Sequence, residues 1–302
     1  MYGAAIASRD ACRASGSKHL PYTIAVFGAG AMGSAVGHRL YSHGATVLTF
    51  VDGRREQTRR RAQSAGMIAS SLQDIAAADL ILSTVPPAEA LSVARLIAPA
   101  LKETASKAAF IDFNAINPET MKSVQSVFTS IDCDVIDGSV IGGPPRADSG
   151  GPSFYVSGSK AYRAEILSGL GLNLKRIDGE VGAASALKMV YAGLSKGLIG
   201  LGATMLLAAS KSGSAESLIL EMGESVPDLL NRFEKSVPDM YPKAYRWVAE
   251  MKEIAEFLGP DDPGHALFTA MAAVFERIAA DESDGKTLSS TMNHVLTLID
   301  RN

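Results

Sequence analysis

The fold is decided by the stretch Tyr22-Thr-Ile-Ala-Val-Phe27, which runs directly into Gly28-Ala-Gly30-Ala-Met-Gly33. A short apolar run followed by G-x-G-x-x-G predicts a strand, a tight turn and the start of a helix, with free backbone N–H groups for a pyrophosphate. A helix-like segment over residues 32–43 and a second apolar run over residues 45–51 follow. Glycine and alanine produce this hexapeptide by chance, but the flanking strand and helix favour a dinucleotide-binding turn over an incidental one. Its predicted cofactor contacts are Gly28, Ala29, Gly30, Ala31, Met32 and Gly33.

Short apolar runs then alternate with helical segments as far as residue 180. Strands that are apolar along their whole length are typical of a parallel sheet covered by helices on both faces. We therefore predict an α/β domain of the Rossmann type, with a doubly wound parallel sheet, over residues 21–180. The further expected strands are residues 79–85, 108–112, 133–137, 153–157 and 172–177, and the helices between them include 87–101 and 118–129.

The pattern changes near Gly182, after which apolar residues recur only at helical spacing. Residues 183–210 predict one interdomain helix, longer than most helices of compact domains. Residues 181–302 are expected to form an all-helical substrate and dimerisation domain, and residues 1–20 a flexible leader. The formal charge of −3 divides accordingly, because residues 181–302 hold 11 basic and 16 acidic residues and residues 1–180 hold 18 and 16.

Composition excludes several classes of function. Near-neutral net charge argues against non-specific nucleic-acid binding. Cys12 and Cys133 are the only cysteines, which excludes a disulfide framework and a cysteine-based metal site and fits a reducing cytoplasm. No uncharged run reaches the ~20 apolar residues of a membrane helix. We expect a cytoplasmic protein acting on a small molecule, with no bound metal, nucleic acid or membrane.

The end of the second expected strand bears on the choice between NAD and NADP. Asp52 stands where an acidic residue would bond the ribose 2′-hydroxyl of NAD. Arg54 and Arg55 begin the loop beside that ribose, where guanidinium groups can clamp a 2′-phosphate. We predict that NADP is preferred and that NAD remains possible. The later triplet over residues 59–61 reads more simply as a solvated helix face.

Lys188 is the best candidate for handling the proton during hydride transfer. It lies at the beginning of the long helix among alanine, leucine, methionine and valine. Apolar surroundings disfavour the ammonium form and lower the pKa of a lysine toward the ~7–8 that suits a general acid or base. A lysine that extends from the helix into solvent is an equally good reading of the residues alone.

These motifs together resemble the β-hydroxyacid dehydrogenases, the family of 3-hydroxyisobutyrate and 6-phosphogluconate dehydrogenases. The resemblance covers residues 22 to about 260, and residues 241–251 resemble a branch with its own helical C-terminal domain. Gly28-Ala-Gly-Ala-Met-Gly33 is similar to the family's opening motif and Asp137-Gly-Ser-Val-Ile-Gly142-Gly143 to its substrate loop, usually D-x-x-x-S-G-G. Lys188 falls on the family's catalytic lysine.

The resemblance implies hydride transfer between nicotinamide and a β-hydroxyacid-type substrate (a 3-hydroxy acid, semialdehyde or 3-oxo acid), with Lys188 as general acid/base. Gly142 and Gly143 would offer backbone N–H groups to a substrate carboxylate. Asn114 is either a cofactor contact or a loop cap, and Lys252 either faces the site or lies on a helix surface. The remaining predicted cofactor contacts, at the end of the strand over residues 79–85, are Val85 and Pro86.

Two departures from the family pattern concern the substrate. Ala192 stands where the family commonly has asparagine, and Ile141 replaces the serine of S-G-G. Tyr191 and Ser195, at i+3 and i+7 from Lys188, share its helical face and are candidates to replace the missing amide. An apolar Ile141 beside the reacting carbon suggests a bulkier or less polar substrate.

Two other functions compete with a dehydrogenase. One is an imine reductase on the same architecture, although such enzymes usually carry aspartate or tyrosine where this chain has Lys188. The other is a non-catalytic NADP-binding sensor. The long helix is rich in small and apolar residues, so we expect the C-terminal helices and a second subunit to cover it in a homodimer.

Overall fold

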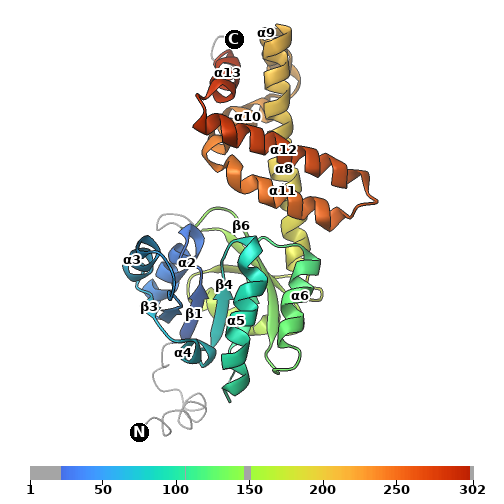
Figure 1. Ribbon diagram of the computed structural model, residues 1–302. Helices are drawn as coiled ribbons and strands as arrows, with labels where there is room; N and C mark the ends of the chain where they lie inside the picture. Colours follow the sequence, from blue (N-terminus) through green and yellow to red (C-terminus); the bar gives the residue numbers. More distant parts are fainter. Residues whose placement is uncertain (1–21, 106, 146–150, 300–302) are drawn as a thin grey trace. The chain divides into compact units, whose positions relative to one another are not determined.

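The computed structural model describes residues 22–105, 107–145 and 151–299 (Figure 1). The chain divides into two compact units, one of residues 1–114 and 124–181 and the other of residues 115–123 and 182–302. The expected leader over residues 1–20 lies outside the described residues.

The first unit is built on an eight-stranded sheet with the strand order β3-β2-β1-β4-β5-β6-β7-β8. Neighbouring strands from β3 through β6 are parallel, so their carboxyl ends meet at one edge of the sheet. The strands are β1 Thr23–Phe27, β2 Thr46–Thr49, β3 Ile68–Ala69, β4 Leu80–Ser83, β5 Ala109–Asp112, β6 Val135–Ile141, β7 Ser153–Ser157 and β8 Asn173–Arg176.

Helices connect the parallel strands, and α2 and α5 lie beside the sheet in Figure 1. In α2, Val36 and Leu40 are one turn apart and both fully buried, so this face packs on the apolar strands. These helices are α2 Ala31–Ser42, α3 Glu56–Ser64, α4 Leu72–Ala76, α5 Ala90–Glu103, α6 Pro118–Phe128 and α7 Ile166–Gly169, with 3-10 turns η1 Pro87–Glu89 and η2 Ala161–Glu165.

The predicted α/β fold is therefore confirmed, with one refinement at the far edge of the sheet. Strand β7 pairs antiparallel with β6, and β8 runs parallel to β7. Only residues 142–152 connect β6 to β7, which is too short for the helical crossover that a parallel neighbour needs.

The second unit is helical around α8, Ala183–Ser212, which confirms the predicted long helix and extends it by two residues. Helices α11 and α12 pack against each other as a hairpin and both contact α8 (Figure 1). A buried cluster that includes Met251, Phe275 and Met292 joins these helices. The other elements are α9 Ala215–Ser225, α10 Pro227–Met240, η3 Tyr241–Lys243, α11 Ala244–Leu258, α12 Pro263–Ser283 and α13 Thr287–Leu296.

Among the described helices, α8 alone is long and apolar enough to cross a bilayer by length and composition. The core helix of a soluble protein passes the same test, and 39% of the most apolar window of α8 is buried in the structure. The packing of α8 against five neighbouring helices, α9 to α13, fits a core helix.

Candidate functional site

The glycine turn lies between β1 and α2 at the carboxyl edge of the sheet. Gly28 has a φ of +92°, and a Cβ there would lie 2.5 Å from the carbonyl oxygen of Thr84. A Cβ on Gly33 would lie 2.0 Å from the carbonyl oxygen of Gly28, so α2 and β1 pack too closely for any side chain. A Cβ on Gly30 would meet nothing within 4 Å. The turn therefore fits a pyrophosphate, because it leaves open space beside the first N–H groups of α2, which no described side chain caps.

Asn114 supports the neighbouring loops from a buried position after β5. Its Oδ1 accepts a hydrogen bond from the Val85 N–H at 2.7 Å, and its Nδ2 donates to Ser83 Oγ and to Asp112 Oδ2. Both N–H bonds of the amide are therefore used within the protein. Asn114 thus caps these loops, and its contact with the cofactor stays a prediction. Pro86, beside Val85, is exposed.

The loop after β2 places the predicted ribose contacts on the surface. Asp52, Arg54 and Arg55 are all exposed, and Gly53 between them has a φ of +71°. Arg54 Nη2 donates to Glu89 Oε2 at 2.9 Å, across to the turn after β4. Both side chains of this pair are more than 40% exposed, so the pair contributes little stability and leaves the guanidinium available to an anion.

Arg61 is a candidate cofactor contact that sequence reasoning missed. It belongs to the triplet interpreted as a solvated face, yet its Nη1 donates to the Ala29 carbonyl oxygen at 3.4 Å. Its guanidinium therefore lies against the glycine turn. Arg60 matches the solvated reading, since it pairs with Glu56 at 2.9 Å on an exposed face. Only the tertiary fold distinguishes these neighbours in the sequence.

The predicted substrate loop begins where β6 ends. Ile141 is half-buried, and Gly142 and Gly143 are exposed. Gly142 has a φ of +122°, and a Cβ on Gly143 would meet nothing within 4 Å. Because β6 is parallel to β1, β4 and β5, this bare backbone lies at the same sheet edge as the glycine turn.

Two carboxylates are buried in the sheet just before this edge. Asp112 on β5 is paired in register with Asp137 on β6, and neither is exposed. Burial raises the pKa of Asp112 to about 7, and the adjacent Asp137 adds to the rise, while hydrogen bonds from Asn114 oppose it. Ser157 Oγ donates to Asp137 at 2.9 Å. The pair therefore lies within the sheet, on neighbouring strands.

In the second unit, Lys188 is half-buried on the first turns of α8. Burial lowers the pKa of Lys188 to about 8, Glu250 acts to raise it, and Lys196 acts to lower it further. Lys196 forms an ion pair with Glu250, and its Nζ lies 5.3 Å from the centre of the Trp247 ring. Lys188 is therefore held near a half-buried ion pair, at a pKa suited to proton transfer near neutral pH.

Tyr191 and Ser195 follow Lys188 on α8 and line an apolar pocket of about 560 Å³ with residues of α10 and α12. Tyr191 is 50% exposed, and Ser195 Oγ donates to the Ala192 carbonyl of its own helix at 3.5 Å. Lys188 is not among the lining residues of this pocket. The role of Tyr191 and Ser195 as substitutes for the missing asparagine remains a prediction.

Lys252 is exposed on α11, beside a contact that the sequence did not predict. The next residue, Glu253, accepts two hydrogen bonds from Asn117, from the backbone N–H at 3.0 Å and from Nδ2 at 2.9 Å. Asn117 Oδ1 also accepts from the Thr120 N–H at the start of α6. The Asn-Pro pair before a helical pattern signalled the cap, but only the fold reveals the glutamate. The described residues hold no cluster of three metal-ligating side chains.

Two family models match the chain. The NAD binding domain of 6-phosphogluconate dehydrogenase matches residues 23–172, and a domain of unknown function (DUF1932) matches residues 209–278. An uncharacterized 28.5 kDa protein of Methanothermus fervidus is 27% identical over 219 residues, or 70% of this chain and 81% of that protein. The 2-(hydroxymethyl)glutarate dehydrogenase of Eubacterium barkeri is 26% identical over 202 residues, or 65% of this chain and 62% of that enzyme.

Solved structures share the fold across most of the chain. A conserved protein of unknown function, described as similar to 3-hydroxyacid dehydrogenases, is 25% identical with a TM-score of 0.70, covering 89% of this chain and 99% of its own. The 3-hydroxyisobutyrate dehydrogenase of Mycobacterium tuberculosis has a TM-score of 0.70 at 20% identity, covering 91% and 99%. An imine reductase of Myxococcus stipitatus has a TM-score of 0.55 at 16% identity, covering 91% and 100%.

Proposed function

We propose that this chain transfers a hydride between NADP and a β-hydroxyacid-type substrate, with Lys188 as general acid/base. The chain belongs to the β-hydroxyacid dehydrogenase superfamily and is a dehydrogenase acting on CH–OH groups. The observation that carries this proposal is the half-buried Lys188, whose pKa burial lowers to about 8. A solvated surface lysine would keep its ordinary pKa of ~10.4 and would hold its proton throughout the neutral range.

The nicotinamide, when bound, supplies or accepts the hydride at its C4 atom. In the reducing direction Lys188 donates a proton from Nζ to the substrate carbonyl oxygen, and in the oxidising direction it takes the hydroxyl proton. The backbone N–H groups of Gly142 and Gly143 bind the substrate carboxylate, because no side chain blocks their approach. Reduction needs the ammonium form, so its rate falls as the pH rises through about 8, and oxidation shows the opposite trend.

The glycine turn and the first turn of α2 hold the pyrophosphate in this proposal. Arg54 and Arg55 bind the 2′-phosphate of NADP, and Arg61, which contacts the turn at Ala29, adds a third cation near the cofactor. An exposed Asp52 can rotate away from that phosphate. The three arginines support a preference for NADP over NAD.

The substrate proposal rests on what the chain lacks. Ala192 is 2% exposed and apolar, and Ile141 is half-buried at the end of β6. Neither offers the polar contact that the family residues would make to a small hydroxy acid. We therefore favour a 3-oxo acid or semialdehyde with an apolar substituent over a compact polar one.

The direct test mixes the full chain with NADPH and a panel of 3-oxo acids and semialdehydes of increasing chain length, with cyclic imines included. We expect loss of the NADPH absorbance with at least one oxo compound, and no loss with Lys188→Met. Lys235→Met, which removes an exposed lysine of α10, is the matched control and should retain full activity.

Three outcomes would contradict the proposal. Turnover that survives Lys188→Met would overturn the role of that lysine. Reduction of imines alone would make the protein an imine reductase. Tight NADPH binding with no turnover across the panel would favour an NADP-binding sensor, and tighter binding of NADH than of NADPH would overturn the cofactor preference.

We also propose that the protein is a cytoplasmic homodimer whose second subunit covers the outward face of α8. This face exposes large apolar side chains, among them Leu194 at 72% and Leu201 at 52%. Contiguous apolar surface of this kind marks an interface in soluble proteins. Size-exclusion chromatography with light scattering should report a dimer, and Leu194→Glu should shift it to monomer; a monomeric native protein would contradict the proposal.

A further inference from the structure

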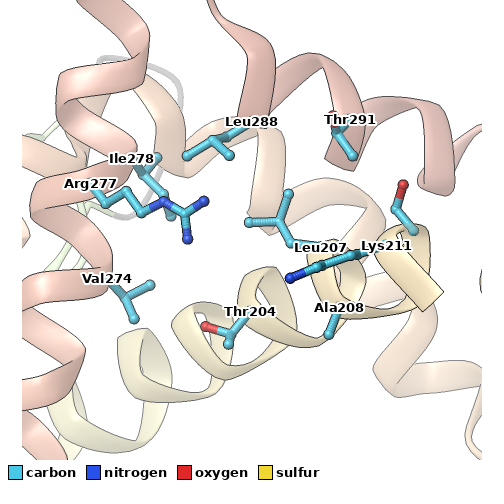
Figure 2. A pocket seen from close by; sticks show the side chains of 10 residues that line it. Thr204, Leu207, Ala208, Lys211, Val274, Arg277, Ile278, Leu288 and Thr291 are labelled. Carbon is cyan, nitrogen blue, oxygen red and sulfur yellow. The ribbon is translucent and has the colours of Figure 1, made fainter.

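A second pocket lies in the helical unit, away from Lys188. It has a volume of about 500 Å³ and lies between α8, α12 and α13 (Figure 2). Its lining residues are Thr204, Leu207, Ala208, Ser210, Lys211, Val274, Arg277, Ile278, Leu288 and Thr291. Lys211 follows Lys188 by 23 residues on the same helix, a separation of roughly 35 Å at ~1.5 Å per residue.

Two cations point into this pocket from opposite walls. Figure 2 shows the Arg277 guanidinium on α12 and the Lys211 ammonium on α8 directed toward the space between them. No acidic residue lines the pocket, and among the described residues neither cation forms an ion pair. Both residues are exposed. Two positive groups aimed at one space repel each other, and an anion between them removes that repulsion.

Two acidic side chains in the last turn of α12, Asp281 and Glu282, already have other partners. Asp281, one turn beyond Arg277, accepts hydrogen bonds from the N–H groups of Leu288 and Ser289 at 2.9 and 3.1 Å. Glu282 pairs with Lys286 at 3.4 Å. The i,i+4 partner that would neutralise Arg277 on an ordinary helix surface is thus used to cap α13.

Apart from the hydroxyl residues Thr204, Ser210 and Thr291, the rest of the lining is apolar. Leu207, Val274, Ile278 and Leu288 form its walls, and Ile278 is 1% exposed. The hydroxyls of Thr204 and Thr291 donate to carbonyl groups of their own helices, each at 2.8 Å. Recognition of charge therefore rests on Lys211 and Arg277, and the walls accept a hydrocarbon.

From this arrangement we propose that the pocket binds a small amphipathic organic anion, with its carboxylate or phosphate group between Lys211 and Arg277 and its alkyl body against the apolar walls. Arg277 offers a planar fork of donors to two oxygens, and Lys211 offers a compact point charge. The volume falls within the ~300–1,000 Å³ of small-molecule sites. This ligand site is additional to the proposed dehydrogenase chemistry and does not depend on it.

Isothermal titration calorimetry of the full chain tests the proposal with three probes that share one alkyl chain. Hexanoate and hexyl phosphate carry the anion, and hexan-1-ol carries none. We expect saturable binding of at least one anion at millimolar concentrations, weakening with added salt, and much weaker binding of the alcohol. The preferred anion identifies the head group.

Variants place the binding event in this pocket rather than near Lys188. Arg277→Gln and Lys211→Gln should each weaken binding about tenfold, because each removes a charge-assisted hydrogen bond whose contribution is reduced by solvent exposure. Ala208→Phe keeps both charges but fills the pocket and should abolish binding. Lys235→Gln, on the exposed face of α10, is the matched control and should change nothing.

Several results would overturn the inference. These are no saturable binding of either anion, equal binding of hexan-1-ol, or binding that survives both Arg277→Gln and Ala208→Phe in variants with native thermal melts. A change from dimer to monomer in Arg277→Gln, without anion binding to the native protein, would instead assign this face to a second copy of the chain. If Arg277→Gln fails to fold, Lys211→Gln and Ala208→Phe still decide the question.

Discussion

Replacing Lys188 with methionine should make the protein more stable and inactive at the same time. Methionine has a similar length and no charge, so the substitution removes the ammonium group while retaining most of the packing. Lys188 is half-buried, and burial lowers its pKa from 10.5 to about 8. Folding therefore disfavours the charged form of this side chain.

The size of the effect follows from that pKa difference. A change from 10.5 to about 8 corresponds to roughly 3 kcal/mol at 1.36 kcal/mol per pKa unit. Because the folded pKa lies below the unfolded one, the penalty is present in full below pH 8, shrinks as the pH rises from 8 to 10.5, and vanishes above 10.5. Lys188→Met should thus raise the free energy of unfolding by up to ~3 kcal/mol at neutral pH.

Two measurements on the same preparations check this prediction. Denaturant unfolding of the native protein and Lys188→Met, from pH 7 to pH 11, should give curves that converge as the pH rises. NADPH turnover at pH 7 should fall by ~10²–10⁴-fold, the usual contribution of a general acid. Lys235→Met should alter neither quantity, because that lysine is exposed.

Two results would contradict the prediction for Lys188→Met. A stability difference that does not depend on pH would mean that the ammonium group of Lys188 is not desolvated. A less stable Lys188→Met with normal turnover would assign the lysine a structural role and leave the proton transfer to another group.

Three further predictions concern the first unit. Gly30→Val should weaken NADPH binding by at least ~100-fold in fluorescence titrations. It should change the melting temperature little, because the valine side chain enters space that no protein atom occupies. Normal binding would mean that the phosphates lie elsewhere. Arg61→Gln should weaken NADPH binding about fivefold, because Arg61 contacts the glycine turn. Arg60→Gln is the control, since it only breaks an exposed pair with Glu56, and it should leave NADPH binding unchanged. Equal effects of the two substitutions would mean that both act through the overall charge of the surface. The folded pKa of Asp112, about 7 against 3.8 unfolded, means that folding favours the neutral form of this side chain. The free energy of unfolding, measured with urea, should therefore fall by up to roughly 4 kcal/mol as the pH rises from 4 to 7. The absence of this fall, or a fall that persists in Asp112→Asn, would assign the pH dependence to other groups.

Local sequence patterns predicted the elements of this fold well. The first strand, the glycine turn and the following helix lie within a residue or two of their predicted bounds, and the long helix predicted over residues 183–210 spans Ala183–Ser212. These features depend on hydrophobic periodicity and on glycine geometry, both of which are encoded within a few neighbouring residues. The predicted sheet was parallel throughout, whereas β7 and β8 reverse, because pairing depends on the length of the connection as well as on the strand pattern.

By itself, then, the sequence determined the succession of strands and helices except for the two-residue strand β3, which it missed. It also determined the dinucleotide turn and a lysine at the start of the long helix. The tertiary structure decided which groups surround them. It places Arg61 against Ala29, 32 residues away, and pairs Lys196 with Glu250, 54 residues away. It also brings Lys211 and Arg277 to one pocket. The reason is physical: periodicity specifies which face of an element is buried, but the partner of a charge on that face is set by the packing of elements distant in the chain.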